Sequence, residues 1–384
     1  MSDGPQPATR TTFAVYVGPP LETLRSMVAS QFQVKDVFLD PYGVPTIQVS
    51  AEPVKSKFKA LLEQLAQQQL VAAIRGSGDA LTIKVFQKPP IKSSRKIINL
   101  VLFVATLATV FLAGYFIWRL YAEIVSPGAD SYLKAGEFAV GLVAIIGLHE
   151  FGHQVAAKYH KLNASLPYFI PGPPPFVPFG TFGALISLRE PPANRDQLFD
   201  LGLSGPVVGL VVTIVVGLLS IVLGLPLSQD QVTRLSNQGL VASTPWPSEP
   251  ALFYLLDGLR DVLRPGLAPD AVLFSQLIFA TQIGVLLTFL NIIPAWQLDG
   301  GHISRAAFGP EGHKIGTVLG VIILILAKYY EFAILMLFLM SFSRRGFSGV
   351  EPLDDISPIS TSRKVLYALS LIMLGLTFSF SPFR

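Results

Sequence analysis

The chain has 384 residues, of which 51% are hydrophobic and 14% are charged. Soluble globular domains carry about 25% charged residues, so the composition excludes an ordinary soluble enzyme and predicts an integral membrane protein. The formal net charge of +4 is small and scattered, which argues against a nucleic-acid partner. Because cysteine is absent, a metal ion would have to be held by histidine, aspartate and glutamate.

Residues 1–95 are predicted to form a small cytosolic α+β domain. The first thirty residues lack the apolar core of a signal peptide, so we expect the N-terminus to stay where it is made. Helical periodicity at 21–32 and at 55–69 is followed each time by a strand–turn–strand pattern. The domain shows no catalytic constellation, and we interpret it as a docking or regulatory module.

Residues 96–384 are predicted to form a polytopic α-helical membrane domain with about seven spans. These are expected at about 97–120, 135–158, 201–225, 271–294, 315–328, 331–343 and 364–382. A single long span over 315–343 is the alternative, and the loop at 227–270 is expected to hold one helix at 251–263. The basic clusters all fall on one side, which predicts a cytoplasmic N-terminus and a cytoplasmic active-site end.

The second predicted span ends in the sequence His-Glu-Phe-Gly-His, an H-E-x-x-H pattern. On a helix, residues four positions apart share a face, so His149 and His153 can offer two imidazoles to one metal ion. Glu150 lies beside them, where a carboxylate can take a proton from a metal-bound water. Three ionisable groups within five residues of a membrane helix are costly, which favours a functional role.

Between the second and third spans, residues 166–190 are rich in proline and glycine. The proline run cannot be helical, and the apolar stretch that follows predicts a strand or a re-entrant β-hairpin that dips toward the metal. Its exposed edge, with Gly180, Thr181, Phe182 and Gly183, would suit pairing with an extended substrate. A proline loop on the surface is an equally good interpretation of the same residues.

A catalytic zinc site usually has three protein ligands, so one more is needed. We select Asp299, since the fourth span ends on the same side of the membrane as the histidine pair and Gly300 and Gly301 allow close backbone approach. Pro294 breaks the helix there and frees backbone groups that can line a site.

Two other residues compete with Asp299 for the third position. Asp200 lies at the mouth of the third span, and His302 lies three residues beyond Asp299. His160 and His313 are expected to be solvent-side histidines, because they lie beyond the predicted membrane edge.

With these motifs in place, the chain resembles the site-2 proteases, the intramembrane zinc metalloproteases of peptidase family M50. That family pairs an H-E-x-x-H helix with an N-x-x-P…L-D-G segment, which here begins at Asn291. Gly205-Pro206 resembles the G-P-x-x-N element, although Gly209 stands where asparagine is common. The N-terminal domain and the proline-rich segment look most like the ethylene-dependent gravitropism-deficient branch of plant chloroplasts and prokaryotes.

The resemblance implies that one Zn²⁺ per chain is bound by His149, His153 and Asp299. Glu150 would be the general base toward water and then the general acid toward the leaving amine. Asn291 would hydrogen-bond the substrate backbone, assisted by the strand that starts at Gly180. The implied substrate is a transmembrane segment of another membrane protein, cleaved within the lipid bilayer.

Two other function classes stay open at this point. A transporter would place ionisable residues along an ion path and would show inverted repeats, which we do not find. A non-catalytic membrane protein that binds partners would usually carry a broken metal motif, whereas this motif is intact. The membrane is expected to be a prokaryotic plasma membrane or a thylakoid-type membrane, and the sequence assigns no oligomeric state.

Overall fold

The computed structural model describes residues 18–50, 53–77, 80–88, 90, 96–240, 249–268, 271–343 and 349–380. The basic residues at 92–95 and 344–345 and the end of the last predicted span lie outside this described part. The chain divides into two compact units. The first holds residues 1–91 with the short segments 193–195 and 352–358, and the second holds the remainder.

The first unit is a four-stranded antiparallel sheet with two helices. Its elements are α1 (Leu21–Ala29), β1 (Val34–Leu39), β2 (Pro45–Val49), α2 (Val54–Ala66), β3 (Leu70–Ser77) and β4 (Ala80–Gln87), and the strand order is β1-β2-β4-β3. Ile47, Ile83 and Ile74 lie opposite one another in register and are fully buried. Leu24 of α1 and Leu61 of α2 belong to the same core, so the alternating strand pattern gives one helix-covered face.

Two short segments from far along the chain complete the first unit at the edge of β3. The amide of Ile74 donates to the carbonyl of Leu353 at 2.9 Å, and the amide of Asp354 donates to the carbonyl of Ala193 at 2.9 Å. The guanidinium of Arg195 also reaches a carboxylate oxygen of Asp355 at 3.3 Å. An edge that would otherwise be open is therefore partly satisfied by residues that the sequence pattern does not connect with it.

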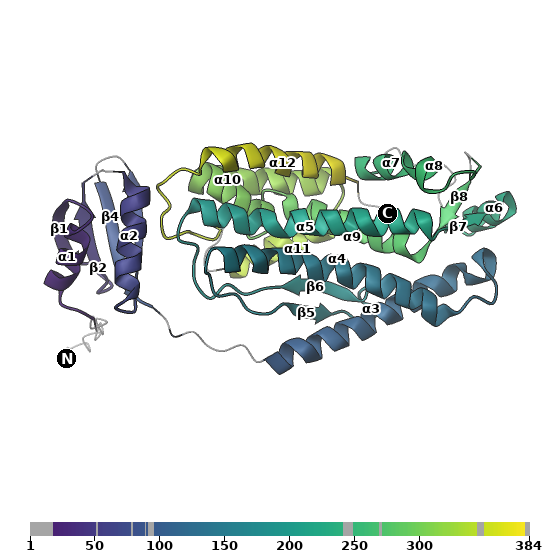
Figure 1. Ribbon diagram of the computed structural model, residues 1–384, viewed down its shortest axis with the longest axis horizontal. Coiled ribbons are helices and arrows are strands. Elements are labelled where there is room, and N and C mark those ends of the chain that lie inside the picture. The colour runs from purple at the N-terminus through teal and green to yellow at the C-terminus, as the bar shows by residue number, and fades with distance from the viewer. Residues whose placement is uncertain are drawn as a thin grey trace, which may run out of the picture. The chain divides into compact units, whose positions relative to one another are not determined.

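The second unit is a bundle of apolar helices (Figure 1). Four described helices are long and apolar enough to cross a membrane: α3 (Lys96–Val125), α4 (Ser131–Tyr159), α5 (Arg195–Val222) and α10 (Asp299–Leu326). Three further helices are shorter: α9 (Gln276–Ile292), α11 (Tyr330–Phe342) and α12 (Thr361–Thr377). This length and composition agree with the predicted membrane protein.

The region between the fourth and fifth predicted spans differs from the prediction. The helix α9 ends at Ile292, and Asp299 is the first residue of α10 rather than the end of the preceding span. Pro294 explains the break, because it has no N–H group to continue the helical ladder. The long helix α10 is itself interrupted at Gly309, where φ is 73°, and this kink precedes the predicted span at 315–328.

The segment at 227–270 also differs from the prediction. Instead of one helix at 251–263 there are two short ones, α7 (Ala251–Asp257) and α8 (Arg260–Leu263), because α7 ends next to Gly258. The helix α6 (Gln229–Asn237) comes before them and begins with a capping box at Ser228. Two short strands, β7 (Leu225–Leu227) and β8 (Val272–Phe274), pair at either end of this segment.

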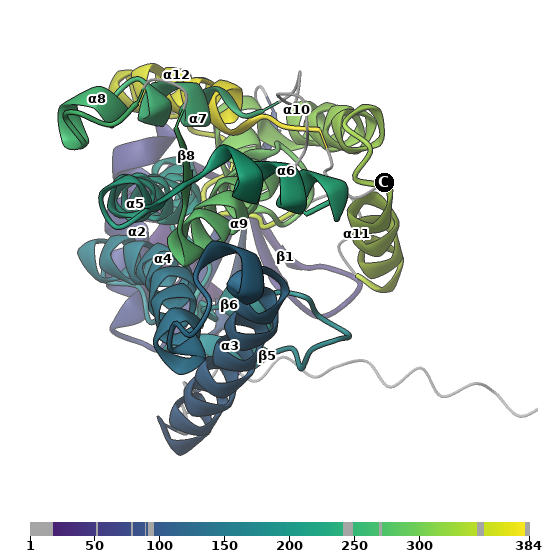
Figure 2. The same cartoon turned by 90° about the vertical axis from the view of Figure 1, so that its right-hand side faces the viewer.

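The proline-rich segment contains a two-stranded antiparallel hairpin. Its strands are β5 (Tyr168–Pro171) and β6 (Thr181–Leu185), and Ile170 pairs with Gly183. Both views show this hairpin beside α3, and β6 also lies next to α4 (Figures 1 and 2). The hairpin therefore occupies the same part of the bundle as the helix that carries the H-E-x-x-H motif.

Candidate metal centre

The two histidines of the motif lie one turn apart on α4. The carboxylate of Asp130 caps the start of this helix by accepting from the amides of Tyr132 and Leu133, and an apolar run leads to His149. The Nε2 atoms of His149 and His153 are 3.1 Å apart, and both residues are 8% exposed. The helical spacing thus brings both imidazoles to one buried point.

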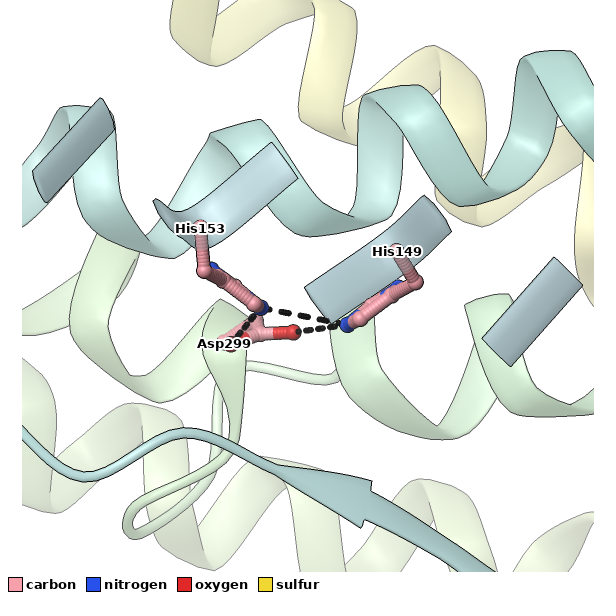
Figure 3. A group of neighbouring side chains, drawn as sticks. All are labelled: His149, His153 and Asp299. Carbon is pink, nitrogen blue, oxygen red and sulfur yellow. Dashed lines mark hydrogen bonds and ion pairs between the residues drawn. The ribbon is translucent and has the colours of Figure 1, made fainter. Parts of the chain in front are cut away.

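Asp299 reaches the same point from the first turn of α10. Its carboxylate oxygens lie 3.2 Å from His149 Nε2 and 3.3 Å from His153 Nε2. Figure 3 shows both rings pointing toward this carboxylate. The candidate ligand atoms all lie within 4.8 Å of one another, and no other group of this kind was found among the described residues. Two imidazoles and a carboxylate form a donor set that suits zinc and leaves a position for water.

The glycine pair after Asp299 explains how this helix start can approach α9. A β-carbon on Gly300 would collide with the carbonyls of Ile292 and Ile293, and one on Gly301 would collide with that of Trp296. Only glycine allows the first turn of α10 to pack this closely on the segment that leaves α9. The position of the Asp299 carboxylate therefore depends on the two residues that follow it.

Three glycines on one face of α5 make room for the metal-site residues. A β-carbon on Gly202 would lie 2.7 Å from the carbonyl oxygen of Asp299, and one on Gly209 would lie 2.9 Å from His149 Nδ1. A β-carbon on Gly205 would overlap the ring of His153. These spacings of three and four residues place the glycines along one helical stripe, so α5 packs directly behind the candidate ligands.

The backbone of α5 also contacts the site. The carbonyl oxygen of Leu201 lies 2.7 Å from Nδ1 of His153, which can donate to it. Such a bond leaves Nε2 free for a metal and fixes the orientation of the ring. Sequence reasoning did not find this contact, because a backbone carbonyl leaves no signature in the residue types.

Glu150 lies on α4 between the two histidines and is 6% exposed. The backbone amide of Ile186, which follows β6 directly, lies close to its carboxylate. The hairpin therefore contacts the site at Ile186, a residue that the sequence did not single out. The side-chain amide of Asn291 lies 3.5 Å from His149 Nε2, at the rim of the same cluster.

The four residues around the start of β6 that the sequence proposed for substrate binding differ from one another in their surroundings. Gly180 packs against the backbone of α3, and Gly183 has a φ of 101° with open space around it. The hydroxyl of Thr181 is turned back into the hairpin, where it donates to the carbonyl of Ile170 at 2.8 Å. The ring of Phe182 is 69% exposed.

Asp200 is placed in a different cluster from the candidate ligands. Its carboxylate accepts from Nε of Arg363 at 2.9 Å and lies 2.8 Å from Nε2 of His160. His302 is a half-buried neighbour of Gly202 and does not belong to the ligand group. Neither rival is therefore brought together with the histidine pair.

The prediction of two solvent-side histidines is wrong. The side chain of His313 is completely buried, because the backbone of Gly349 packs against its ring. His160 is only 11% exposed, since it is held by the carboxylate of Asp200. The prediction used only the positions of these histidines beyond the membrane edge, and such positions do not report the tertiary contacts that bury them.

Comparison with known proteins identifies a family whose model matches the part of the chain that holds this site. Residues 137–327 match the model of Peptidase family M50. This stretch includes both halves of the candidate metal site, the motif on α4 and the start of α10. No solved structure matches the chain.

Similar proteins are found among plant chloroplast proteins. Over 254 residues, 64% of the chain, it is 28% identical to "Probable zinc metalloprotease EGY2, chloroplastic" of Oryza sativa subsp. indica. Over 263 residues, 66% of the chain, it is 27% identical to "Probable zinc metalloprotease EGY1, chloroplastic" of Arabidopsis thaliana. The matches cover 42% and 44% of those proteins, so the chain spans less than half their length. By its family match and these relatives, the chain belongs to peptidase family M50.

Proposed function

We propose that this protein is an intramembrane zinc metalloendopeptidase that cleaves transmembrane segments of membrane-anchored proteins. The observation that carries the proposal is that the buried His149 and His153 meet Asp299 next to the buried carboxylate of Glu150. All four side chains come from helices long and apolar enough to cross a membrane. The printed names of the relatives, which call them probable zinc metalloproteases, support the same activity.

Zinc would be held by Nε2 of His149, Nε2 of His153 and the carboxylate of Asp299. When bound in such a site, zinc supplies Lewis acidity that makes water a nucleophile near neutral pH and polarises a carbonyl group. The carbonyl of Leu201 orients the ring of His153, and the glycine stripe of α5 leaves space for both rings.

Glu150 would carry the protons of the reaction. Its carboxylate takes a proton from the attacking water as the water oxygen bonds to the scissile carbonyl carbon. The same group then gives the proton to the leaving nitrogen, the C–N bond breaks, and the products are a carboxylate and an amine.

The substrate would have to enter the site as an extended strand. Peptide bonds in a transmembrane helix are hidden by its own hydrogen bonds, so local unwinding must come first. Among the described residues, β6 pairs with β5 alone, and its other edge is free for a substrate strand. We assign the strand from Gly180 to Gly183 and the amide of Asn291 to substrate binding.

The number of membrane spans and the side of the membrane that each end of the bundle faces are also proposed here. We infer about seven spans, with α9, α11 and α12 added to the four long helices, and a hairpin that re-enters the membrane. The N-terminal unit and the end of α4 near Lys158 would face the cytoplasm. The N-terminal unit would act as a docking or regulatory domain, in a plasma or thylakoid-type membrane.

The test is cleavage of a membrane-anchored substrate by the purified protein in lipid vesicles. We expect cleavage to stop when a zinc chelator is added and to return with added zinc. If no substrate is cut with zinc present while the protein still binds membrane partners, the non-catalytic interpretation replaces this one. Ion flux across the vesicle membrane without cleavage would favour a transporter instead.

A further inference from the structure

The helix α3 carries polar side chains on the face that meets the hairpin. Asn99, Thr106 and Thr109 lie at spacings of seven and three residues, which places them near one another on the helix surface. Asn99 is 5% exposed and Thr106 is 1% exposed, within a helix that is otherwise strongly apolar. Polar groups in such a helix are costly unless they are bonded, and Asn99 and Thr109 each bond a carbonyl next to the hairpin.

Asn99 holds the chain just before β5. Its side-chain amide donates to the carbonyl of Pro167 at 2.9 Å and to the carbonyl of Leu166 at 3.1 Å. These carbonyls belong to a stretch in which proline removes backbone donors, so few other partners are at hand. One asparagine thus fixes the entry of the hairpin against α3.

Thr109 holds the chain just before β6. Its hydroxyl lies 2.6 Å from the carbonyl of Gly180, its shortest acceptor contact, and 3.1 Å from the carbonyls of Ala105 and Thr106 within the helix. A β-carbon on Gly180 would lie 2.5 Å from the Cα of Val110. The backbones of the hairpin and of α3 therefore touch at this point.

An aromatic contact lies between the two polar ones. The rings of Phe103 on α3 and Phe169 on β5 meet edge to face, with their centroids 5.1 Å apart. Phe169 also reaches α4, where a β-carbon on Gly147 would lie 3.5 Å from its ring. From Asn99 to Thr109 the helix rises about 15 Å, so the hairpin is fixed along the length of its strands.

We propose that Asn99 and Thr109 are positioning residues that set the depth of the hairpin and so select the peptide bond to be cut. This inference rests on the proposed function. Because β6 packs against α4, the helix that carries Glu150, a shift of β6 along α3 would move the substrate-binding edge relative to the catalytic carboxylate. Successive residues of a strand are about 3.3 Å apart, so a small shift presents a different bond.

The test compares Thr109→Val and Asn99→Leu with Thr106→Val. Thr106 is a matched control, since its buried hydroxyl has no hydrogen-bond partner among the described residues. Thr109→Ser, which keeps the hydroxyl, is the conservative rescue. Bound zinc, kcat, KM and the cleaved bond are measured on a membrane-anchored substrate, and hydrogen–deuterium exchange is measured on residues 168–185.

We expect Thr109→Val and Asn99→Leu to keep their zinc, to expose the hairpin to faster exchange, and to cut at additional bonds. The value of kcat/KM should fall about threefold to tenfold, mainly through KM, as expected for a lost buried hydrogen bond. Thr106→Val and Thr109→Ser should behave as wild type.

If hydrogen–deuterium exchange in the hairpin is unchanged in Thr109→Val and Asn99→Leu, these two residues do not hold the hairpin in place. Faster exchange with the same cleaved bond and the same KM would show that the position of the hairpin does not select the bond. If the wild type itself cuts nothing, the proposed function fails, whereas the exchange measurement still decides whether the two residues hold the hairpin.

Discussion

The carbonyl oxygen of Leu201 on α5 lies 2.7 Å from Nδ1 of His153 on α4. One turn further along α5, Gly205 presents a bare α-carbon to the same ring. A single helix therefore supplies both the hydrogen bond that orients this imidazole and the space that it occupies. The metal site depends on α5 although that helix provides no ligand.

Gly205→Ala should reduce metal affinity at least about tenfold, because the new methyl group would displace the ring of His153. Gly136→Ala is the matched control, since a β-carbon at that position on α4 meets no atom within 4 Å. Elemental analysis of purified protein after dialysis against zinc buffers measures the effect. Normal zinc binding in Gly205→Ala would show that the ring of His153 does not need this space.

Asp200→Asn should keep its metal and lose stability. The carboxylate of Asp200 joins Arg363 of α12 to His160, which follows the end of α4, and its partly buried ion pair contributes roughly 1 to 2 kcal/mol. Thermal unfolding and zinc content are measured together. Asp230→Asn is the control, because its ion pair with Arg234 is exposed and should contribute little. Loss of zinc from Asp200→Asn would return that residue to the list of ligands.

The acid stability of the N-terminal unit should depend on Asp40. The Lys84 ammonium, 2.8 Å away, holds the pKa of the Asp40 carboxyl below its usual range. A carboxyl whose pKa is lowered on folding adds stability above its unfolded pKa, and this stability is lost as pH falls through the lower folded pKa. The pair therefore stabilises the fold at neutral pH and ceases to do so in acid.

Asp40→Asn should therefore speed hydrogen exchange in residues 34–49 at neutral pH, and the difference from wild type should vanish in acid, as the pH falls through the lowered pKa of Asp40. Each comparison is made at equal pH, so that intrinsic exchange rates cancel. Asp36→Asn, which changes an exposed carboxylate on β1, serves as the control. A difference that persists unchanged in acid would rule out the ion pair as its cause.

The sequence predicted the membrane helices and the strand pattern of the N-terminal unit, because hydrophobic length and alternation are local properties. The i, i+4 spacing likewise placed His149 and His153 on one face of α4. The proximity of Asp299 was predicted from the side on which the fourth span ends and from the flexible Gly300-Gly301 pair, and the structure shows why these two glycines must follow it.

Contacts made by backbone groups could not be predicted in the same way. The carbonyl of Leu201 and the amide of Ile186 act on the site without any signal in the residue types. The burial of His313 likewise depends on the distant residue Gly349, and the edge of β3 on the distant residue Leu353. Sequence periodicity reports which face is apolar, but it does not identify the partner of that face.

The most direct measurement is the zinc content of wild type, Asp299→Ala and Glu150→Gln, with cleavage of a membrane-anchored substrate recorded on the same preparations. We predict about one zinc per chain in wild type and in Glu150→Gln, much less in Asp299→Ala, and cleavage by the wild type alone. Full zinc retention by Asp299→Ala, or cleavage by Glu150→Gln at the wild-type rate, would contradict the roles given to these residues.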